Sequence, residues 1–357
     1  MAECADPGLM LNDFMEDLRR RAFEEKLPFK GVFELTPRCN FNCEMCYVHL
    51  KPEEIPAVGR ERTAEEWIAL AQQARDAGMV ELTLTGGEPF VRPDFRQIYE
   101  AVCGMDLLTQ IFTNGFLLDE ETVQWLRRFP PHALRITLYG MCDETYEAVC
   151  GVKGGFTRVL QSLTLLRRAH IPTYLVATIT KENEAELGAM IRFARGNHFP
   201  FTYTSSLVPP VRGASADAKA HEVSFELPPQ EEIERLRAEN TRYPKKPLTD
   251  FLLACRNYRR AFWITWSGQM QLCAFLTEPA VMVRAEPGGF LESWQSLLAR
   301  LETLRQPGAC ASCRYERYCD RCPGVLYAEC GASDRTCDSF CRKAQRTFAI
   351  YGPESSV

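Results

Sequence analysis

Three closely spaced cysteines, Cys39, Cys43 and Cys46, are the residues whose types and spacing most directly suggest chemistry. Three thiolates on one short loop hold three irons of a cubane iron-sulfur cluster, and the fourth iron is then open to another ligand. A zinc knuckle with a distant fourth ligand, or a purely structural cluster, has the same spacing. The loop by itself therefore leaves both an open cluster and a structural metal site as alternatives.

Two further motifs follow the cysteine loop at regular intervals. Gly86-Gly87-Glu88-Pro89 comes directly after an expected strand. A simple turn would explain this tetrapeptide, but two adjacent glycines also let the backbone approach a ligand closely. The tripeptide Thr113-Asn114-Gly115 follows the next expected strand. Because the ends of parallel strands meet on one side of a sheet, these motifs are expected to lie near the cysteines.

In this order, the three motifs resemble those of radical SAM enzymes. The resemblance implies that the open iron binds S-adenosylmethionine and delivers the electron that breaks its carbon-sulfur bond, giving a 5'-deoxyadenosyl radical. It also implies that Gly-Gly-Glu-Pro contacts the methionyl amino group and that Thr137 offers a hydroxyl to the ribose. The residues expected to contact the cofactor are Tyr47, Gly86, Gly87, Glu88, Pro89, Thr113, Asn114, Thr137 and Thr178.

One motif departs from the pattern of this family. Where the family more often has Ser and Asp, this chain has Thr137 and Tyr139. Tyr139, Cys142 and Glu147 follow the fourth expected strand and are the candidates for a catalytic acid, base or hydrogen donor. A packing or surface role is the simpler interpretation of each. Cys4, Cys103 and Cys150 are interpreted as small hydrophobic residues.

A second group of cysteines occupies the C-terminal part of the chain. Their spacing suits a zinc ribbon, but their order, with Gly268 five residues before Cys273, resembles the SPASM domain, which binds two auxiliary iron-sulfur clusters. The resemblance implies that one cluster is held by Cys310, Cys313, Cys319 and Cys341, and the other by Cys255, Cys273 and Cys322. Cys322 follows Cys319 after two residues, where the family commonly has three. The fourth ligand of the second cluster is therefore open, with Cys330, Cys337 or the substrate as candidates.

Strand-like and amphipathic helical stretches alternate six times between residues 32 and 207, which predicts repeated βα units and a parallel sheet. Six units are too few for a closed eight-stranded barrel, so we expect an α/β fold with a partial (β/α)6 TIM-like barrel and a small Cys-rich C-terminal iron-sulfur domain. The expected strands are 32–36, 80–85, 109–113, 134–139, 173–180 and 201–207. Capping boxes are expected between Thr63 and Glu66 and between Asn183 and Glu186, and Asp119 is expected to cap the helix after the third strand. A further helix is expected from Asn12 to Lys26, and a hairpin around Gly268 is expected to present Cys273. The expected divisions are an N-terminal helical segment (1–29), the radical SAM barrel (30–215), a helical linker (216–250), the auxiliary-cluster domain (251–345) and a tail (346–357).

Composition limits the class of protein. The chain has 357 residues, 46% of them hydrophobic, and a formal net charge of -5, which gives no general attraction to nucleic acid. It has neither a signal peptide nor an apolar run long enough to span a bilayer, so a cytoplasmic location is expected. Sixteen cysteines in a reducing compartment favour metal ligation over disulfides.

The resemblance implies an oxidoreductase that uses three 4Fe-4S clusters and S-adenosylmethionine, one cluster binding the cofactor and two auxiliary. Because SPASM relatives mostly act on peptides, the expected reaction is thioether or carbon-carbon crosslinking of a ribosomally made peptide. Formylglycine formation in a sulfatase, peptide epimerisation and modification of a tetrapyrrole or other small molecule are the alternatives, and a zinc-binding scaffold is the alternative without catalysis. The expected partners are a peptide or small protein substrate, a flavodoxin or ferredoxin as one-electron donor, and a separate leader-binding protein, since the N-terminal helix is too short to bind a leader.

Overall fold

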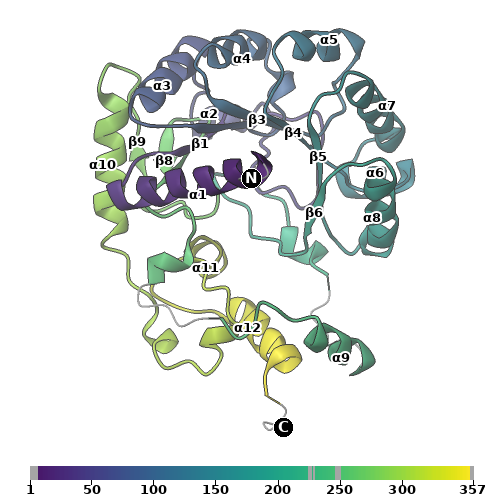
Figure 1. The fold of residues 1–357 in the computed structure, drawn as a ribbon, viewed down its shortest axis with the longest axis vertical. Coiled ribbons are helices and arrows are strands. Elements are labelled where there is room, and N and C mark those ends of the chain that lie inside the picture. Colours follow the sequence, from purple (N-terminus) through teal and green to yellow (C-terminus); the bar gives the residue numbers. More distant parts are fainter. Residues whose placement is uncertain (1–6, 224–226, 228–229, 246–250, 354–357) are drawn as a thin grey trace, which may run out of the picture.

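The computed structural model describes residues 7–223, 227, 230–245 and 251–353. Six parallel strands alternate with helices in its N-terminal part (Figure 1). The strands lie side by side in sequence order from β1 to β6, each paired in parallel with the next. This arrangement confirms the predicted partial (β/α)6 barrel. The strands are β1 (Lys30–Glu34), β2 (Glu81–Thr85), β3 (Leu108–Thr113), β4 (Ala133–Thr137), β5 (Thr173–Thr178) and β6 (Phe201–Thr204).

Helices cover the outer face of this sheet (Figure 1). Strand residues alternate between the two faces, and on β1 the side chain of Phe33 is buried on the helix side, with its ring centroid 4.9 Å from that of Trp67 on α3. Packing of this kind fixes the strands, so that their C-terminal ends meet at one rim. The helices of this part are α2 (Ile55–Val58), α3 (Ala64–Asp76), α4 (Phe95–Cys103), α5 (Glu120–Arg128), α6 (Asp143–Cys150), α7 (Gly155–Arg168) and α8 (Leu187–Gly196).

The helix starts follow the local sequence in two of three predicted cases. Thr63 and Glu66 form the predicted capping box of α3, and the Asp119 side chain accepts a hydrogen bond from the Thr122 backbone at the start of α5. The capping box predicted at Asn183 is wrong. Its side chain instead accepts from the Thr180 backbone N–H and donates to two backbone carbonyls, and a short 3-10 turn precedes α8.

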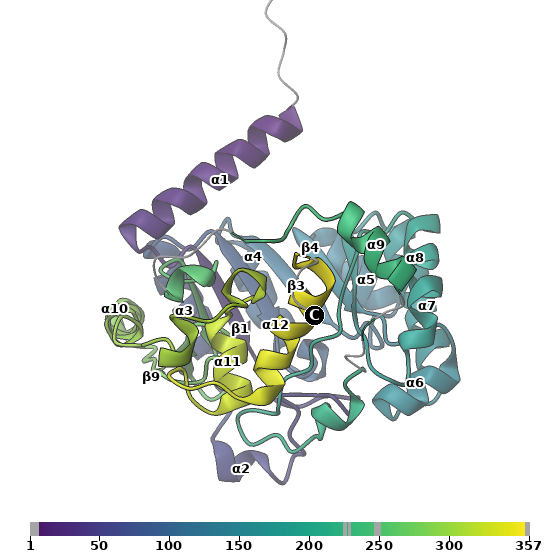
Figure 2. The same ribbon diagram turned by 90° about the horizontal axis from the view of Figure 1, so that it is seen from below.

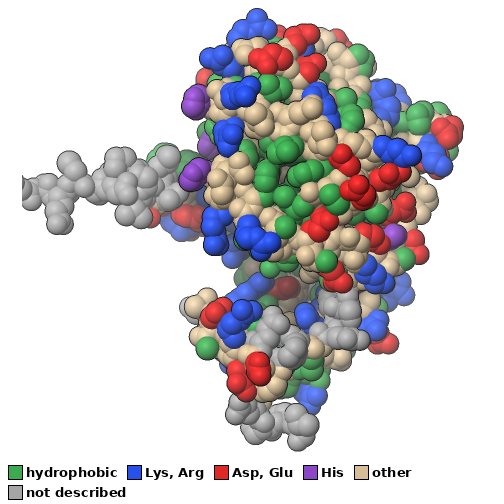
Figure 3. Space-filling view, turned by 90° about the vertical axis from the view of Figure 1, so that its right-hand side faces the viewer, with side chains coloured by type: hydrophobic (Ala, Val, Ile, Leu, Met, Phe, Trp, Pro, Cys, Tyr) green, Lys and Arg blue, Asp and Glu red, His purple; other side chains and the backbone are tan. Residues whose placement is uncertain are grey.

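The C-terminal part continues the same sheet beyond β1. Strand β7 (Ala261–Ile264) pairs in parallel with β1, and β8 (Gln269–Gln271) and β9 (Val281–Met282) follow as antiparallel neighbours. The turn between β7 and β8 contains Gly268, which has a φ of 95° and confirms the predicted hairpin. Figure 3 shows the rest of this part as a smaller lobe beneath the body. Its helices are α9 (Gln230–Ala238), α11 (Pro323–Cys330) and α12 (Asp338–Tyr351), while α10 (Gly289–Leu301) lies beside the hairpin (Figure 1).

The N-terminal helix α1 (Pro7–Glu25) begins earlier than the predicted residue 12. Its C-terminal half is attached to the barrel, because Ala22 is buried and Arg19 forms a 2.6 Å ion pair with Glu81 at the start of β2. Its other half projects from the body, and Phe14 is 58% exposed (Figure 2). Among the helices in the described ranges, none has the length and apolar character needed to cross a membrane.

Candidate functional site

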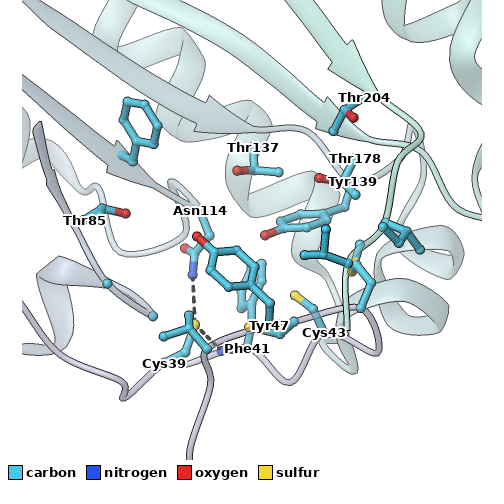
Figure 4. Close-up of a pocket in the computed structure, with 18 of the residues that line it drawn as sticks. Cys39, Phe41, Cys43, Tyr47, Thr85, Asn114, Thr137, Tyr139, Thr178 and Thr204 are labelled. Carbon is cyan, nitrogen blue, oxygen red and sulfur yellow. Dashed lines mark hydrogen bonds between the residues drawn. The ribbon is translucent and has the colours of Figure 1, made fainter. Parts of the chain in front are cut away.

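The cysteine loop leaves β1 at the rim where the parallel strands end. Cys39, Cys43 and Cys46 all line one cavity of about 310 Å³ (Figure 4). Backbone N–H groups of Phe41 and His49 donate to the sulfurs of Cys39 and Cys46, each at 3.3 Å. Such donors favour thiolate ligands, so the loop presents three sulfurs and their supporting N–H groups to one space.

Without a metal, this environment opposes ionisation of the thiols. Burial raises the pKa of Cys46 to about 11 and that of Cys39 further. A hydrogen bond with Cys150, together with burial, raises the pKa of Cys43. Iron binding would therefore displace protons from all three. Among the described residues no three Cys, His, Asp or Glu side chains converge on a point suited to a single metal ion, whereas in a cubane each thiolate binds a different iron.

The Gly-Gly-Glu-Pro motif packs directly against the cysteine loop. A Cβ atom on Gly87 would lie 2.3 Å from the carbonyl oxygen of Arg38, and one on Gly86 would lie 2.5 Å from that of Thr36. The backbone N–H of Gly87 donates to the Thr36 carbonyl at 2.7 Å. Both glycines also line the cavity. Glycine is therefore required here because two segments of the protein approach each other closely. These segments are the Gly-Gly-Glu-Pro turn and the backbone just before the cysteine loop, so the contact joins the two motifs.

Glu88 does not line the cavity, but it holds the third motif in place. Its carboxylate accepts hydrogen bonds from the Thr113 hydroxyl at 2.9 Å, the Asn114 backbone at 2.7 Å and the Phe90 backbone at 3.1 Å. Burial raises the pKa of Glu88 to about 7. Pro89 begins a short 3-10 turn and is buried. Neither Glu88 nor Pro89 lines the cavity, so the structure does not bring these two predicted cofactor contacts to it.

A row of threonine hydroxyls forms the rim of the cavity opposite the cysteines (Figure 4). Each of β2 to β6 ends in a threonine, and all five line the cavity. Three of them, Thr113, Thr137 and Thr178, were predicted, whereas Thr85 and Thr204 were missed. A threonine at or beyond the midpoint of each of these five expected strands was the signal that could have found them. The row offers donors and acceptors to a polar ligand, and Asn114 adds its amide beside Cys39, with 3.8 Å between Nδ2 and Sγ.

Aromatic side chains form the apolar walls. Tyr139 lies between Phe41 and Tyr146, with ring centroids 6.0 Å and 5.8 Å away, and burial raises its pKa. On the other side, Tyr47 packs on Phe275 of the C-terminal part at 5.3 Å. Phe275 was not predicted, because no local pattern shows that the C-terminal part reaches the cavity. These walls limit the access of water to the space between the cysteines and the threonines.

Cys142 and Glu147 do not line the cavity. The Cys142 thiol lies 3.2 Å from the Thr145 hydroxyl and 3.5 Å from a carboxylate oxygen of Glu186. Glu147 is exposed and pairs with Lys153 at 3.6 Å. Of the three candidates for catalysis, the structure brings only Tyr139 to the cavity. Of the three cysteines interpreted as small hydrophobic residues, Cys150 is buried, Cys103 is half-buried and Cys4 lies outside the described residues.

The C-terminal cysteines form two neighbouring groups. Negative charge on Cys273 or Cys322 would raise the pKa of Cys255, which shows that these three lie close together. A Cβ atom on Gly324 would lie 2.9 Å from the Cys273 sulfur, so α11 begins against this group. In the other group, negative charge on Cys313 or Cys341 would raise the pKa of Cys310, and negative charge on Cys310 would raise the pKa of Cys319. The two groups agree with the two predicted sets of cysteines, and the clusters themselves stay a prediction.

Cys330 and Cys337 are bonded to each other as a disulfide between the end of α11 and the start of α12. In this state neither sulfur is available as a thiolate ligand. The assignment of one of them as the fourth ligand stays a prediction that requires reduction of this bond.

Comparison with known proteins gives a family for the N-terminal part. A model of the radical SAM superfamily matches residues 33–194. The AdoMet-dependent heme synthase of Methanosarcina barkeri is 27% identical over 332 residues, which cover 84% of this chain and 92% of that protein. The sporulation killing factor maturation protein SkfB of Bacillus subtilis is 27% identical over 208 residues, which cover 57% of this chain and 48% of SkfB. The matched region therefore spans about half the length of SkfB.

The fold is similar to that of Streptococcus suis SuiB. With S-adenosylmethionine bound, SuiB superposes with a TM-score of 0.65 and 18% identity, over 96% of this chain and 82% of SuiB. In complex with its precursor peptide SuiA, the TM-score is 0.64 at 17% identity, with the same coverage. The family match over residues 33–194 agrees with the geometry of the site. The site has three cysteines after β1, two glycines after β2 and threonines at the ends of β2 to β6. Residues 33–194 therefore match the radical SAM superfamily, whose members bind S-adenosylmethionine and a four-iron cluster.

Proposed function

We propose that this chain cleaves S-adenosylmethionine reductively and uses the 5'-deoxyadenosyl radical to take a hydrogen atom from a peptide. The observation that carries the proposal is the cavity itself, in which Cys39, Cys43 and Cys46 lie opposite the threonine row. When bound, the cluster would supply the electron for cleavage of the cofactor.

The residues of the chain have separate tasks in this proposal. The three thiolates hold the cluster, and the N–H groups of Phe41 and His49 support two of them. The hydroxyls of Thr85, Thr137, Thr178 and Thr204 orient the polar groups of the cofactor, and the backbone at Gly86 and Gly87 borders it. Tyr47 and Tyr139 exclude water, which protects a reactive radical from side reactions. Positioning of the substrate carbon-hydrogen bond within this enclosed space is the main contribution of the protein.

Two auxiliary four-iron clusters are part of the proposal. Cys310, Cys313, Cys319 and Cys341 would hold one, and Cys255, Cys273 and Cys322 the other. The mutual pKa effects within each group support this division. The second group is nearer the cavity, since Phe275, two residues after Cys273, lines it. The divisions of the chain at residues 29, 215, 250 and 345 are also part of the proposal.

A peptide is the first candidate for the substrate. SkfB is a maturation protein by name, and SuiB has been solved with a precursor peptide. We propose a thioether or carbon-carbon crosslink rather than epimerisation, because a crosslink removes two hydrogens and needs an electron acceptor, which an auxiliary cluster supplies. A flavodoxin or ferredoxin as reductant, a separate leader-binding protein and a cytoplasmic location complete the proposal.

A tetrapyrrole is the second candidate. The match to the AdoMet-dependent heme synthase extends over 92% of that protein, whereas the match to SkfB ends at about half its length. Both candidates require the same cleavage of S-adenosylmethionine, so they differ only in what the cavity accepts.

The first experiment measures cleavage without substrate. Protein reconstituted with iron and sulfide in the absence of oxygen should release 5'-deoxyadenosine and methionine when dithionite is added. The Cys43→Ala variant should release none, while Cys103→Ala serves as the matched control, because Cys103 lies on α4 outside the cavity. Reduced clusters without any cleavage in the unaltered protein would refute the enzymatic proposal.

The second experiment identifies the reaction. A peptide encoded beside this gene is incubated with the enzyme in deuterated water and analysed by mass spectrometry. Loss of two hydrogens without deuterium at an α-carbon supports crosslinking. Unchanged composition with one stable deuterium per modified residue shows epimerisation instead. A porphyrin incubated in parallel tests the second candidate.

A further inference from the structure

Arg135 lies on the inner face of the barrel, below the threonine row. On β4, Leu134 and Ile136 are buried toward the helices, so Arg135 and Thr137 share the opposite face. Thr137 lines the cavity. Because two residues of a strand advance by about 7 Å, the backbone of Arg135 lies about that far below Thr137. Arg135 does not itself line the cavity, but its side chain lies on the same face of the sheet, next to Phe112, which does.

The guanidinium of Arg135 is held between two aromatic rings. Phe112 on β3 and Tyr174 on β5 are its direct neighbours in the sheet register. The carbon of the guanidinium lies 5.5 Å from each ring centroid, and Nε donates to Gln110 at 3.2 Å. The two rings are 38% and 37% exposed, and Phe112 lines the cavity. The group is thus fixed in place on a surface that a ligand can reach.

This cation lacks a carboxylate partner. No described residue places a carboxylate oxygen within 4.0 Å of Arg135, and none accepts a hydrogen bond from its two Nη groups. Other buried arginines of the barrel are paired, as Arg92 is with Asp94 at 2.7 Å and Arg212 with Glu34 at 2.7 Å. A half-buried guanidinium with open donors in a fork is the arrangement that binds a carboxylate through two parallel hydrogen bonds.

We propose that Arg135 binds a carboxylate of the substrate, and that the cavity therefore selects acid-bearing substrates. The inference rests on the proposed function, since it concerns what the same cavity accepts. The carboxylate belongs either to an acidic residue or C-terminus of a peptide or to a propionate of a tetrapyrrole. In both cases the flanking rings of Phe112 and Tyr174 would pack against the apolar atoms next to the acid.

The test compares acidic probes with neutral counterparts of the same shape. One pair is a pool of N-acetylated, C-amidated octapeptides with a single Glu and the same pool with Gln in its place. The other pair is a porphyrin tetracarboxylate and its methyl ester. Retention of each probe by the iron-loaded full chain with S-adenosylmethionine is measured by equilibrium dialysis, without reductant. The proteins are the unaltered chain, Arg135→Gln, Arg135→Lys and Arg128→Gln, the last a matched control on the exposed side of α5.

The unaltered chain and Arg128→Gln should retain the acidic member of one pair about tenfold better than the neutral member. Arg135→Gln should lose this preference, and Arg135→Lys should keep part of it. A preference in the Glu pair identifies a peptide, and one in the porphyrin pair a tetrapyrrole. Equal retention of acidic and neutral probes, or an acid preference that survives Arg135→Gln, overturns the inference.

Because no reductant is present, failure of this inference is separate from failure of S-adenosylmethionine cleavage. Thermal unfolding verifies that the Arg135 variants are folded, and Arg135→Lys provides the comparison if Arg135→Gln does not fold.

Discussion

Arg212 donates to the carboxylate of Glu34 at 2.7 Å, although the two residues are 178 positions apart. Both side chains are almost completely buried, at 6% and 1% exposure. The Trp263 indole N–H also donates to Glu34 at 3.1 Å, and Arg212 donates to the carbonyl oxygen of Ala274 at 2.8 Å. One ion pair therefore connects β1, the segment after β6 and the C-terminal hairpin, next to the cavity.

Removal of one member of this ion pair should lower the free energy of unfolding much more than removal of both members. Arg212→Ala leaves the Glu34 carboxylate buried without a counter-ion, which should cost about 3–5 kcal/mol in the free energy of unfolding. The double variant Glu34→Gln/Arg212→Met should recover most of that loss. Urea unfolding of the variants measures both effects. A single variant within 1 kcal/mol of the unaltered chain would show that the pair has no such role.

Glu88 should make stability depend on pH. Its pKa is about 7 in the folded chain, against an ordinary value of 4.5, because of burial. The folded state therefore holds the proton more tightly, and the contribution of Glu88 to stability falls as the pH rises from 4.5 to 7, by up to about 1.4 kcal/mol per pH unit.

The Glu88→Gln variant should lack this dependence of stability on pH. It should also be less stable at pH 5, because the new amide cannot accept from all three donors that surround it. Urea unfolding at a series of pH values checks both effects, with Glu121→Gln, on the exposed side of α5, as control. If the free energy of unfolding changed with pH in the same way for Glu88→Gln and the unaltered chain, the raised pKa of Glu88 would be contradicted.

Gly87→Ala should displace the cysteine loop. The added methyl group would lie 2.3 Å from the Arg38 carbonyl oxygen, and its other near neighbours are also backbone atoms of Pro37 and Arg38, just before the cysteine loop. We expect loss of the iron held by Cys39, Cys43 and Cys46, measured as iron per chain. Gly196→Ala is the matched control, because nothing lies within 4 Å of its Cβ position. Full iron content in Gly87→Ala would show that the loop tolerates the displacement.

Three clusters predict an iron content of about twelve atoms per chain after reconstitution without oxygen. Replacement of Cys39, Cys43 and Cys46 by Ala should remove about one third of it. Metal analysis of the two proteins checks this ratio. Stoichiometric zinc in place of iron would instead support the scaffold interpretation.

The Cys330–Cys337 disulfide gives a separate expectation. Since these sulfurs bond to each other, replacement of both cysteines by Ser should leave the iron content unchanged. The same metal analysis decides the matter. Loss of about four iron atoms would identify one of these cysteines as the missing ligand of an auxiliary cluster.

The sequence predicted what depends on local periodicity. The six strands, the hairpin at Gly268 and the place of the cysteine loop after β1 follow from alternation and turn residues. Contacts between distant residues could not be predicted in this way. Cys142 follows a strand end as expected, but Glu186, 44 residues later, holds its thiol beside Thr145 and outside the cavity. The contribution of Phe275 to the cavity depends likewise on how the C-terminal hairpin packs.

The parallel pairing of β7 with β1 has a consequence for how this chain can be divided. A fragment that ends before residue 251 would expose the whole edge of β1, with backbone groups that β7 now satisfies from Lys30 to Phe33. Such an edge recruits strands from other molecules, so the isolated barrel should aggregate. The C-terminal part therefore cannot be exchanged as a cassette, because any replacement must also supply a strand in the correct register.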